Sequence, residues 1–235
     1  MSMPRTPVTH QKVPAGITRL VADLAALPGV EAVALGGSRA SGQPRADSDW
    51  DLGVYYRGRF DAEGVRMLGL PGEVSDPGAW AGFMNGGAFL SVDGVKVDVM
   101  YRDLDHIDHW AAEAEAGRWE LRRCPGYLAG MASYVLLGEA ELGRVLHGEL
   151  RRPGPFPAAL RESAPQRWRW ERDFALMYAT MHRSRQDDVA ASGALAVAAV
   201  AEAYARLAEQ GQWALNDKGL LARAGVTLDQ LDDRL

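Results

Sequence analysis

The stretch VEAVALGGSRASGQPRADSDWDLGVYY, from Val30 to Tyr56, determines the fold of this 235-residue chain. Residues 30–35 are a mainly apolar run that ends at Gly36-Gly37, as is typical of a buried strand. After a polar turn, Asp49 and Asp51 alternate with apolar residues. A period of two puts both carboxylates on one face of a second strand. We therefore predict two strands joined by a turn that begins with glycine.

This pair of carboxylates is unfavourable without a partner. Two like charges about 7 Å apart repel by roughly 2–3 kcal/mol at an effective dielectric constant of about 20. A divalent cation removes the penalty, and hard cations such as Mg²⁺ prefer carboxylate oxygens. The glycines let another group approach the backbone closely, and the amides that follow them can bind an anion. A phosphate site beside a metal-binding carboxylate pair indicates phosphoryl or nucleotidyl transfer.

Another carboxylate stands in mid-strand in a predicted hairpin further along the chain. Residues 88–92 and 95–101 flank Asp93-Gly94, which is a strong two-residue turn signal. In the second arm, Asp98 stands in mid-strand on the face opposite the aliphatic side chains. An acid in that position normally needs a partner. We therefore predict that Asp98 has a functional rather than a purely structural role.

The motifs GGSRASG and SDWDLGV resemble the signature of the nucleotidyltransferase superfamily that includes DNA polymerase beta. Members carry a Gly-Gly/Ser turn, then Asp-x-Asp on the next strand and a third carboxylate on a later strand. The resemblance is closest to the small bacterial aminoglycoside and lincosamide nucleotidyltransferases and to minimal nucleotidyltransferases. It implies that Asp49, Asp51 and Asp98 are catalytic and hold Mg²⁺, two ions in all, with ATP as the nucleotide donor.

The same resemblance implies a set of nucleotide-binding residues near the turn. Gly37 and Ser38 would contact the β- and γ-phosphates, and Arg39 would offset charge on the departing pyrophosphate. A short helix opening at Ser38 would point its amides at a phosphate. Ser48 either donates a hydrogen bond to a phosphate oxygen or is a plain turn residue.

A nucleotide contact is also expected from the C-terminal region. In the segment WALNDKGLL, Asn216 is predicted to cap the following helix, which would place Lys218 in its first turn. A lysine there opposes the helix dipole, so a negative group would compensate it. Lys218 therefore either reaches the triphosphate, as the resemblance implies, or is a surface lysine.

Two acids of the helical region are substrate-binding candidates. Glu171 and Asp173 stand beside Trp170, Phe174 and Met177, a stripe that is more often core than ligand platform. The acids would bind an amino-rich substrate, or they are solvated charges on a helix surface.

The order of the predicted elements gives an α+β fold with two domains. Alternating strands and helices predict a nucleotidyltransferase domain with a mixed β-sheet flanked by helices, and the helical run that follows predicts an α-helical bundle. The predicted divisions are a flexible arm at 1–14, the first domain at 15–124 and the helical domain at 125–235. Helices are expected at 128–146, 166–182, 189–210, 217–224 and 229–234.

Composition narrows the class of partner. A net charge of −5 and a pI near 5.6 argue against general nucleic-acid binding and fit a cationic or neutral small substrate. The single cysteine, Cys124, fits a reducing cytoplasm. The charge-poor run at 189–201 is too short and alanine-rich for a membrane span. The sequence leaves the oligomeric state open.

The function expected from motif and composition is transfer of AMP from ATP to a hydroxyl of a small molecule. An aminoglycoside-like antibiotic is the favoured acceptor, which would make the protein a resistance enzyme. One alternative is a minimal nucleotidyltransferase that acts as an antitoxin by adenylylating a protein or RNA partner. Another is a non-catalytic nucleotide-binding module, although that would predict loss of one of the three acids.

Overall fold

The two strands predicted around the glycine turn are present in the computed structural model, which describes residues 13–40 and 48–232. β1 (Val30–Leu35) and β2 (Trp50–Tyr56) are antiparallel neighbours, with Leu35 opposite Leu52. The short helix predicted after the first strand is also present, as α2 (Gly37–Ala40). The predicted arm at 1–14 lies almost entirely outside the described residues.

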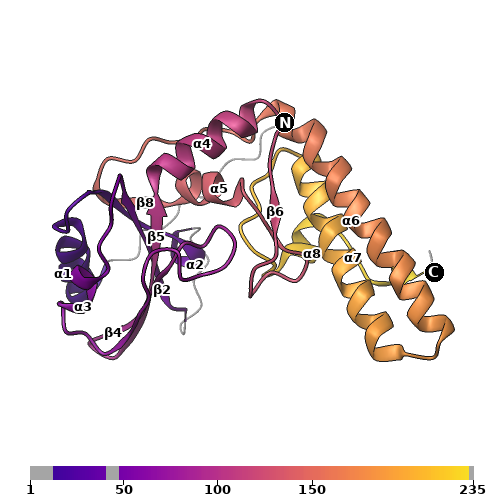
Figure 1. Ribbon diagram of the computed structural model, residues 1–235, viewed down its shortest axis with the longest axis horizontal. Helices are drawn as coiled ribbons and strands as arrows, with labels where there is room; N and C mark the ends of the chain where they lie inside the picture. Colours follow the sequence, from indigo (N-terminus) through magenta and orange to yellow (C-terminus); the bar gives the residue numbers. More distant parts are fainter. Residues whose placement is uncertain (1–12, 41–47, 233–235) are drawn as a thin grey trace. The chain divides into compact units, whose positions relative to one another are not determined.

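The remaining elements complete a mixed sheet and a set of helices (Figure 1). The other strands are β3 (Gly72–Val74), β4 (Gly87–Val92), β5 (Val95–Asp103), β6 (Leu121–Arg122), β7 (Met131–Ala132) and β8 (Arg144–Gly148). The other helices are α1 (Ala15–Ala25), α3 (Glu63–Arg66), α4 (Leu104–Glu115), α5 (Val135–Leu142), α6 (Ala158–Ser184), α7 (Asp188–Glu209), α8 (Leu220–Ala224) and α9 (Asp229–Asp232).

Six strands form the main sheet in the order β3-β4-β5-β2-β1-β8. β2 and β5 run parallel, whereas the other neighbours are antiparallel. The β4–β5 hairpin turns at Asp93-Gly94, where both residues have positive φ angles of 51° and 78°, as a type I′ turn requires. The predicted α+β class with a mixed sheet is therefore confirmed.

One face of this sheet is covered by α1. The helix buries Ile17, Leu20 and Leu24 in a cluster that includes Leu52 and Val99 from the strands. Because side chains alternate along a strand, Asp51 and Asp98 point to the opposite face. The hydrophobic core thus fixes the strands and leaves the carboxylates on the face that α1 does not cover.

The helix predicted over 128–146 is only partly present. The chain there forms β7, then α5, then β8, and β8 pairs with β1. Pairing with β1 satisfies backbone groups that would otherwise form an open sheet edge, and that tertiary gain overrides the helical pattern.

Because β8 returns to the sheet, the chain divides differently from the predicted single boundary near Pro125. The first unit comprises Met1–Ile107 and Glu139–Arg152, and the second comprises Asp108–Gly138 and Pro153–Leu235. The divisions fall inside α4, inside α5 and just before α6. The segment from β8 onwards to Arg152 therefore belongs with the strands, which a boundary at one point of the chain could not describe.

The second unit is built on the helices α6 and α7, which pack together along their lengths (Figure 1). α6 starts eight residues earlier than predicted and carries Pro165 inside it, buried. Trp168 stacks on Tyr204 of α7 with ring centroids 4.6 Å apart. α7 is long and apolar enough to cross a membrane by length and composition, but half of that segment is buried within the protein, as in a core helix.

Candidate active site

Asp51 and Asp98 are register partners on the parallel strands β2 and β5. Both carboxylates are partly buried, and the flanking residues Leu52, Val97 and Val99 are fully buried on the other face. Neighbouring strands lie about 4.8 Å apart, so the two acids occupy adjacent positions on one surface of the sheet. The structure thus brings together two acids that are 47 residues apart in the sequence.

The glycine turn is packed against one of these acids. The amide of Gly36 donates a hydrogen bond of 2.7 Å to the backbone oxygen of Asp51. Gly37 has a φ of +61°, and a Cβ at this position would lie 1.8 Å from Oδ2 of Asp51. Only glycine combines that backbone conformation with so little space. Ser38 follows in α2 and is partly buried.

Arg39 holds the chain that leads into β2. Its Nε donates to the backbone oxygens of Ser48 and Asp49 at 3.2 and 3.1 Å, and its guanidinium lies 4.7 Å above the ring of Trp50. We predicted that Arg39 and Ser48 bind phosphate. In the structure Arg39 fixes the backbone at Asp49, which is partly buried two residues before Asp51. Phosphate binding by Arg39 and Ser48 stays a prediction.

Two of the three acids predicted to hold a metal ion are neighbours in the structure. Among residues 13–40 and 48–232, no group of three or more His, Cys, Asp or Glu side chains is placed to hold a metal ion. The in-register pair of Asp51 and Asp98 does fit Mg²⁺, because this ion is usually bound by one or two carboxylates together with substrate phosphates and water. Mg²⁺ binding remains a prediction.

Lys218 lies outside the helix in which it was predicted. α8 begins at Leu220, and Gly219 with a φ of +65° occupies its N-cap position. The side chain of Asn216 accepts a hydrogen bond from the amide of Lys218 at 3.0 Å and so forms a turn before the helix rather than a cap. The neighbouring Asp217 accepts hydrogen bonds from the Tyr204 hydroxyl and the Leu128 amide.

The two predicted substrate acids on α6 both have arginine partners. Glu171 pairs with Arg167 at 2.7 Å, and Asp173 pairs with Arg172 at 2.8 Å. Arg172 also reaches Glu202 on α7 at 2.6 Å. Neither acid is therefore an uncompensated negative charge that would attract a cationic substrate.

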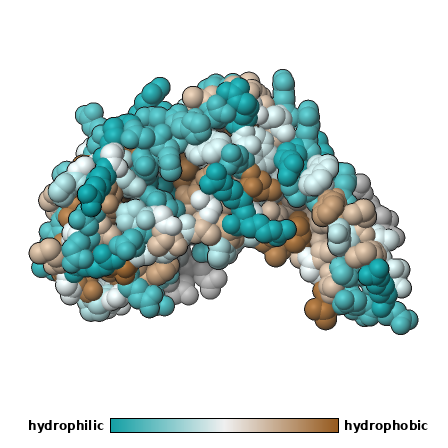
Figure 2. Space-filling model, viewed as in Figure 1, coloured by the Kyte–Doolittle hydropathy of each residue, from teal (hydrophilic) through white to brown (hydrophobic). Residues whose placement is uncertain are grey.

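The aromatic stripe beside these acids is not core. Trp170, Phe174 and Met177 expose 52%, 45% and 56% of their surfaces. Trp170 stacks on Phe174 at 5.3 Å, and Phe174 contacts Tyr178 at 5.0 Å. Hydrophobic surface is visible along this helical pair in Figure 2. The helical periodicity was right, but the stripe faces away from the α6–α7 contact, which is made by residues such as Trp168.

Two further charged residues were missed in the sequence. Arg144 on β8 stands opposite Leu35, next to the glycine turn, and its Nε is buried with no hydrogen-bond partner among the described residues. Arg102 on β5 is 3% exposed and pairs with Glu139 of α5 through two hydrogen bonds of 2.5 and 3.1 Å. Neither position stands out by pattern, because both are single charges whose burial depends on tertiary packing.

The comparisons with known proteins do not establish a family. No model of a protein family matches the chain, and no curated protein matches it. Among solved structures, it is similar to a nucleotidyltransferase-like protein from Exiguobacterium sibiricum 255-15, at 12% sequence identity and a TM-score of 0.40, over 92% of this chain and 69% of that one. So distant a likeness carries no argument.

The motif residues lie on or next to the elements predicted for them. The structure places the glycine turn after β1, Asp-x-Asp at the start of β2 and Asp98 on β5 beside it. This is the order of elements that the motif resemblance implies. The reaction itself, its metal and its substrates are matters for proposal.

Proposed function

We propose that this protein is a Mg²⁺-dependent nucleotidyltransferase that transfers AMP from ATP to a hydroxyl of a small molecule and releases pyrophosphate. The observation that carries the proposal is the register pairing of Asp51 with Asp98, with the Gly37 backbone against Asp51. Two adjacent carboxylates provide oxygen ligands for a cation, and the backbone amides that follow the glycine turn can bind a phosphate.

Asp49, Asp51 and Asp98 would hold Mg²⁺, and the acceptor oxygen would attack the α-phosphorus of ATP. The bond to the β-phosphate breaks, pyrophosphate leaves with the bonding electrons, and the hydroxyl proton passes to a carboxylate. That base is Asp98 or a glutamate of the helical unit. When bound, Mg²⁺ would neutralise charge on the phosphate oxygens. Gly37 and Ser38 would orient the β- and γ-phosphates through their backbone amides.

The acceptor proposed first is an aminoglycoside, which would make the protein a cytoplasmic resistance enzyme. The acidic net charge supports this proposal, whereas the arginine partners of Glu171 and Asp173 weaken it. Lys218 would contact the triphosphate, as the motif resemblance implies. The acceptor panel must therefore include uncharged and lincosamide compounds as well as polycations.

The test is pyrophosphate release from ATP and Mg²⁺ with a panel of aminoglycosides and lincosamides. We expect Asp51→Asn to lower the rate by about a hundredfold or more, because it removes a charged metal ligand that helps to stabilise the charge developing in the transition state. Asp23→Asn, an exposed acid on α1, is the matched control and should leave the rate unchanged. Full activity in Asp51→Asn would show that the site is wrongly assigned.

A second candidate function, transfer of AMP to a protein, is favoured by one observation. The stacked row of Trp170, Phe174 and Tyr178 is exposed along α6, and exposed aromatic clusters are characteristic of protein interfaces. Incubation with ATP labelled at the α-phosphate in cell extract distinguishes the two functions. Label on a co-purifying protein, lost in Phe174→Ser, would favour the protein acceptor, and label on a small molecule would favour the first proposal.

A further inference from the structure

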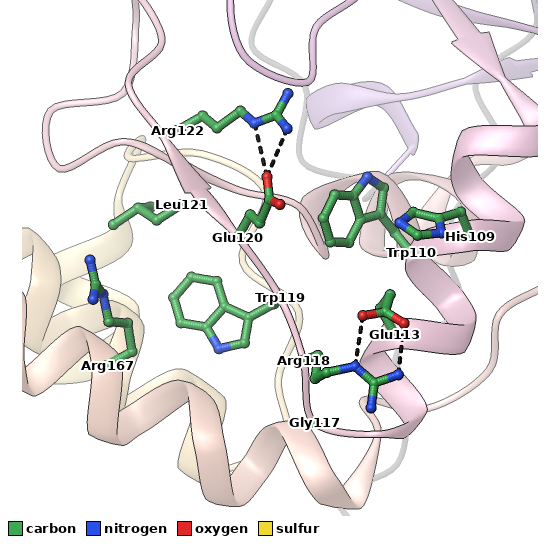
Figure 3. Close-up of a pocket in the computed structure, with 10 residues that line it drawn as sticks. All are labelled: His109, Trp110, Glu113, Gly117, Arg118, Trp119, Glu120, Leu121, Arg122 and Arg167. Carbon is green, nitrogen blue, oxygen red and sulfur yellow. Dashed lines mark hydrogen bonds and ion pairs between the residues drawn. The ribbon is translucent and has the colours of Figure 1, made fainter.

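The second unit contains a cavity of about 800 Å³ that belongs to none of the residues assigned to nucleotide transfer (Figure 3). Its volume lies within the range of small-molecule sites. The lining comes from the end of α4, the segment that follows it through β6, and one residue of α6. The lining includes two tryptophans, two glutamates and two arginines, which are Trp110, Trp119, Glu113, Glu120, Arg118 and Arg122.

Two indole rings give the cavity flat apolar surfaces. Trp119 is held from behind by Tyr134 and Trp168, with ring centroids 5.2 and 5.5 Å away. Trp110 is 9% exposed and has the His109 ring edge-on at 4.9 Å. Rings fixed by packing in this way can stack against a planar ring or the C–H face of a sugar without losing side-chain freedom.

The charged groups of the lining are all paired. The three arginines each have a carboxylate within 2.7 Å, in the pairs Arg118–Glu113, Arg122–Glu120 and Arg167–Glu171. In Figure 3 the Glu113–Arg118 pair lies on one side of Trp119 and the Glu120–Arg122 pair on another. Hydrogen bonding to Arg118 holds the pKa of Glu113 below its usual value, so this acid stays ionised.

The segment that carries these pairs is fixed by backbone contacts. Gly117, with a φ of +73°, ends α4, and its carbonyl accepts a hydrogen bond from Ser163 of α6 at 2.7 Å. Glu120 exchanges hydrogen bonds with Ser133, the residue after β7. The aromatic rings and the ion pairs are therefore held by the folded chain before any ligand arrives.

A paired lining selects against a charged ligand. An anion would have to draw an arginine away from its carboxylate, and a cation would have to draw a carboxylate away from its arginine. An uncharged hydroxyl group needs neither, because it can accept from a guanidinium and donate to a carboxylate at once. Arg118 uses its Nε and one terminal nitrogen for Glu113, which leaves further N–H donors and carboxylate lone pairs for hydroxyl groups.

We propose that this cavity binds an uncharged ring compound with several hydroxyl groups, either a sugar or a nucleoside. The rings of Trp110 and Trp119 contact its face, and the Glu113–Arg118 and Glu120–Arg122 pairs bind its hydroxyls. The proposal does not depend on the transfer reaction, because it concerns binding alone and its test contains neither ATP nor Mg²⁺.

Saturation-transfer NMR and calorimetry on the full chain provide the first test, with glucose, glucosamine, glucose 6-phosphate and adenosine as probes. The three sugars differ mainly in charge. We expect glucose or adenosine to bind in the millimolar range, and glucosamine and glucose 6-phosphate to bind at least tenfold more weakly than glucose if glucose is the ligand type. No binding of either uncharged probe up to about 20 mM, or tighter binding of a charged sugar, would overturn the proposal.

Charge variants then locate the binding site. Glu120 and Arg122 each expose 51% of their side chains, so Glu120→Gln and Arg122→Gln should fold normally. Glu120→Gln leaves an excess arginine and should bind glucose 6-phosphate about tenfold more tightly, whereas Arg122→Gln should do so for glucosamine. The double variant should restore the preference for the uncharged probe. Glu63→Gln, which changes an exposed ion-pair residue on α3, is the control. Unaltered preferences in all variants would place the ligand elsewhere and refute the proposal.

Discussion

Gly37 and Asp51 stand so close that a Cβ on the glycine would lie 1.8 Å from one carboxylate oxygen of the aspartate and 2.7 Å from its carboxyl carbon. The turn after β1 and Asp51 of β2 are therefore in close contact. A side chain at position 37 could be accommodated only if the Asp51 carboxylate rotated away. The glycine that the motif supplies for phosphate access thus also fixes the direction of a carboxylate.

Gly37→Ala should impair the reaction more than the fold. The backbone at φ +61° costs an alanine about 1–2 kcal/mol, and the added methyl group displaces the Asp51 carboxylate. Gly69→Ala is a matched control, because Gly69 has a φ of +65° and a Cβ there would meet nothing within 4 Å. We expect both variants to lose similar stability in denaturant titrations and only Gly37→Ala to lose pyrophosphate release. If the two variants release pyrophosphate equally fast, Gly37 does not belong to the active site.

Arg39→Lys should lower kcat while leaving KM for ATP nearly unchanged. Lysine keeps the positive charge but lacks the guanidinium group that donates to the carbonyls of Ser48 and Asp49. The backbone at Asp49 is therefore held less firmly. If Arg39 bound the triphosphate instead, the main effect would be a higher KM for ATP. Steady-state kinetics at varied ATP decides between these roles. Arg57→Lys, an exposed arginine with carboxylate partners, serves as the control.

The strands that carry the acids could be predicted from the sequence, but the pairing of those strands could not. Alternation around Asp49 and Asp51, and the Asp93-Gly94 turn before Asp98, are local signals, and the structure has the strands they indicate. The partner of Asp51 is set by the parallel pairing of β2 with β5, to which no local pattern points.

The failures have the same physical origin. The helical pattern over 128–146 did not indicate β8, because the pairing of β8 with β1 is a long-range contact. The hydrogen bonds of Arg39 to backbone carbonyls were not predicted, because no sequence motif records them, and a phosphate contact of Arg39 stays a prediction. The stripe of Trp170 and Phe174 shows the limit of periodicity, which indicates one face of a helix but not what covers that face.

Tyr101 should make the protein less stable in alkali. Burial raises the pKa of Tyr101 from 10.0 to about 12, and its hydroxyl has no hydrogen-bond partner among the described residues. Because the folded pKa is the higher one, this stability is full below pH 10 and is lost as the pH rises from 10 to 12.

The variant Tyr101→Phe removes both the titrating group and the unsatisfied hydroxyl. We expect it to be as stable as the wild type or about 1 kcal/mol more stable at pH 7, with a flatter loss of stability between pH 10 and 12. Denaturant midpoints measured across that range test this. A wild-type slope retained in Tyr101→Phe would assign the alkaline loss to other tyrosines.

The ion pair between Arg102 and Glu139 should contribute a large coupling free energy to the stability of the fold. Arg102 is 3% exposed, bonds Glu139 through Nε and one terminal nitrogen, and donates from the other to the backbone oxygens of Met84 and Tyr101. Removing one partner of a buried ion pair leaves an uncompensated charge and typically costs about 3–5 kcal/mol. Arg102→Met and Glu139→Leu should therefore each lower the free energy of unfolding strongly. The double variant should lose about 1–3 kcal/mol less than the two single losses added together.

The exposed pair Arg122–Glu120 gives a control double-mutant cycle, in which the coupling free energy should stay below about 1 kcal/mol. If the two losses of unfolding free energy are additive, the ion pair contributes no coupling free energy between β5 and α5. Apolar contacts alone would then hold α5 in place.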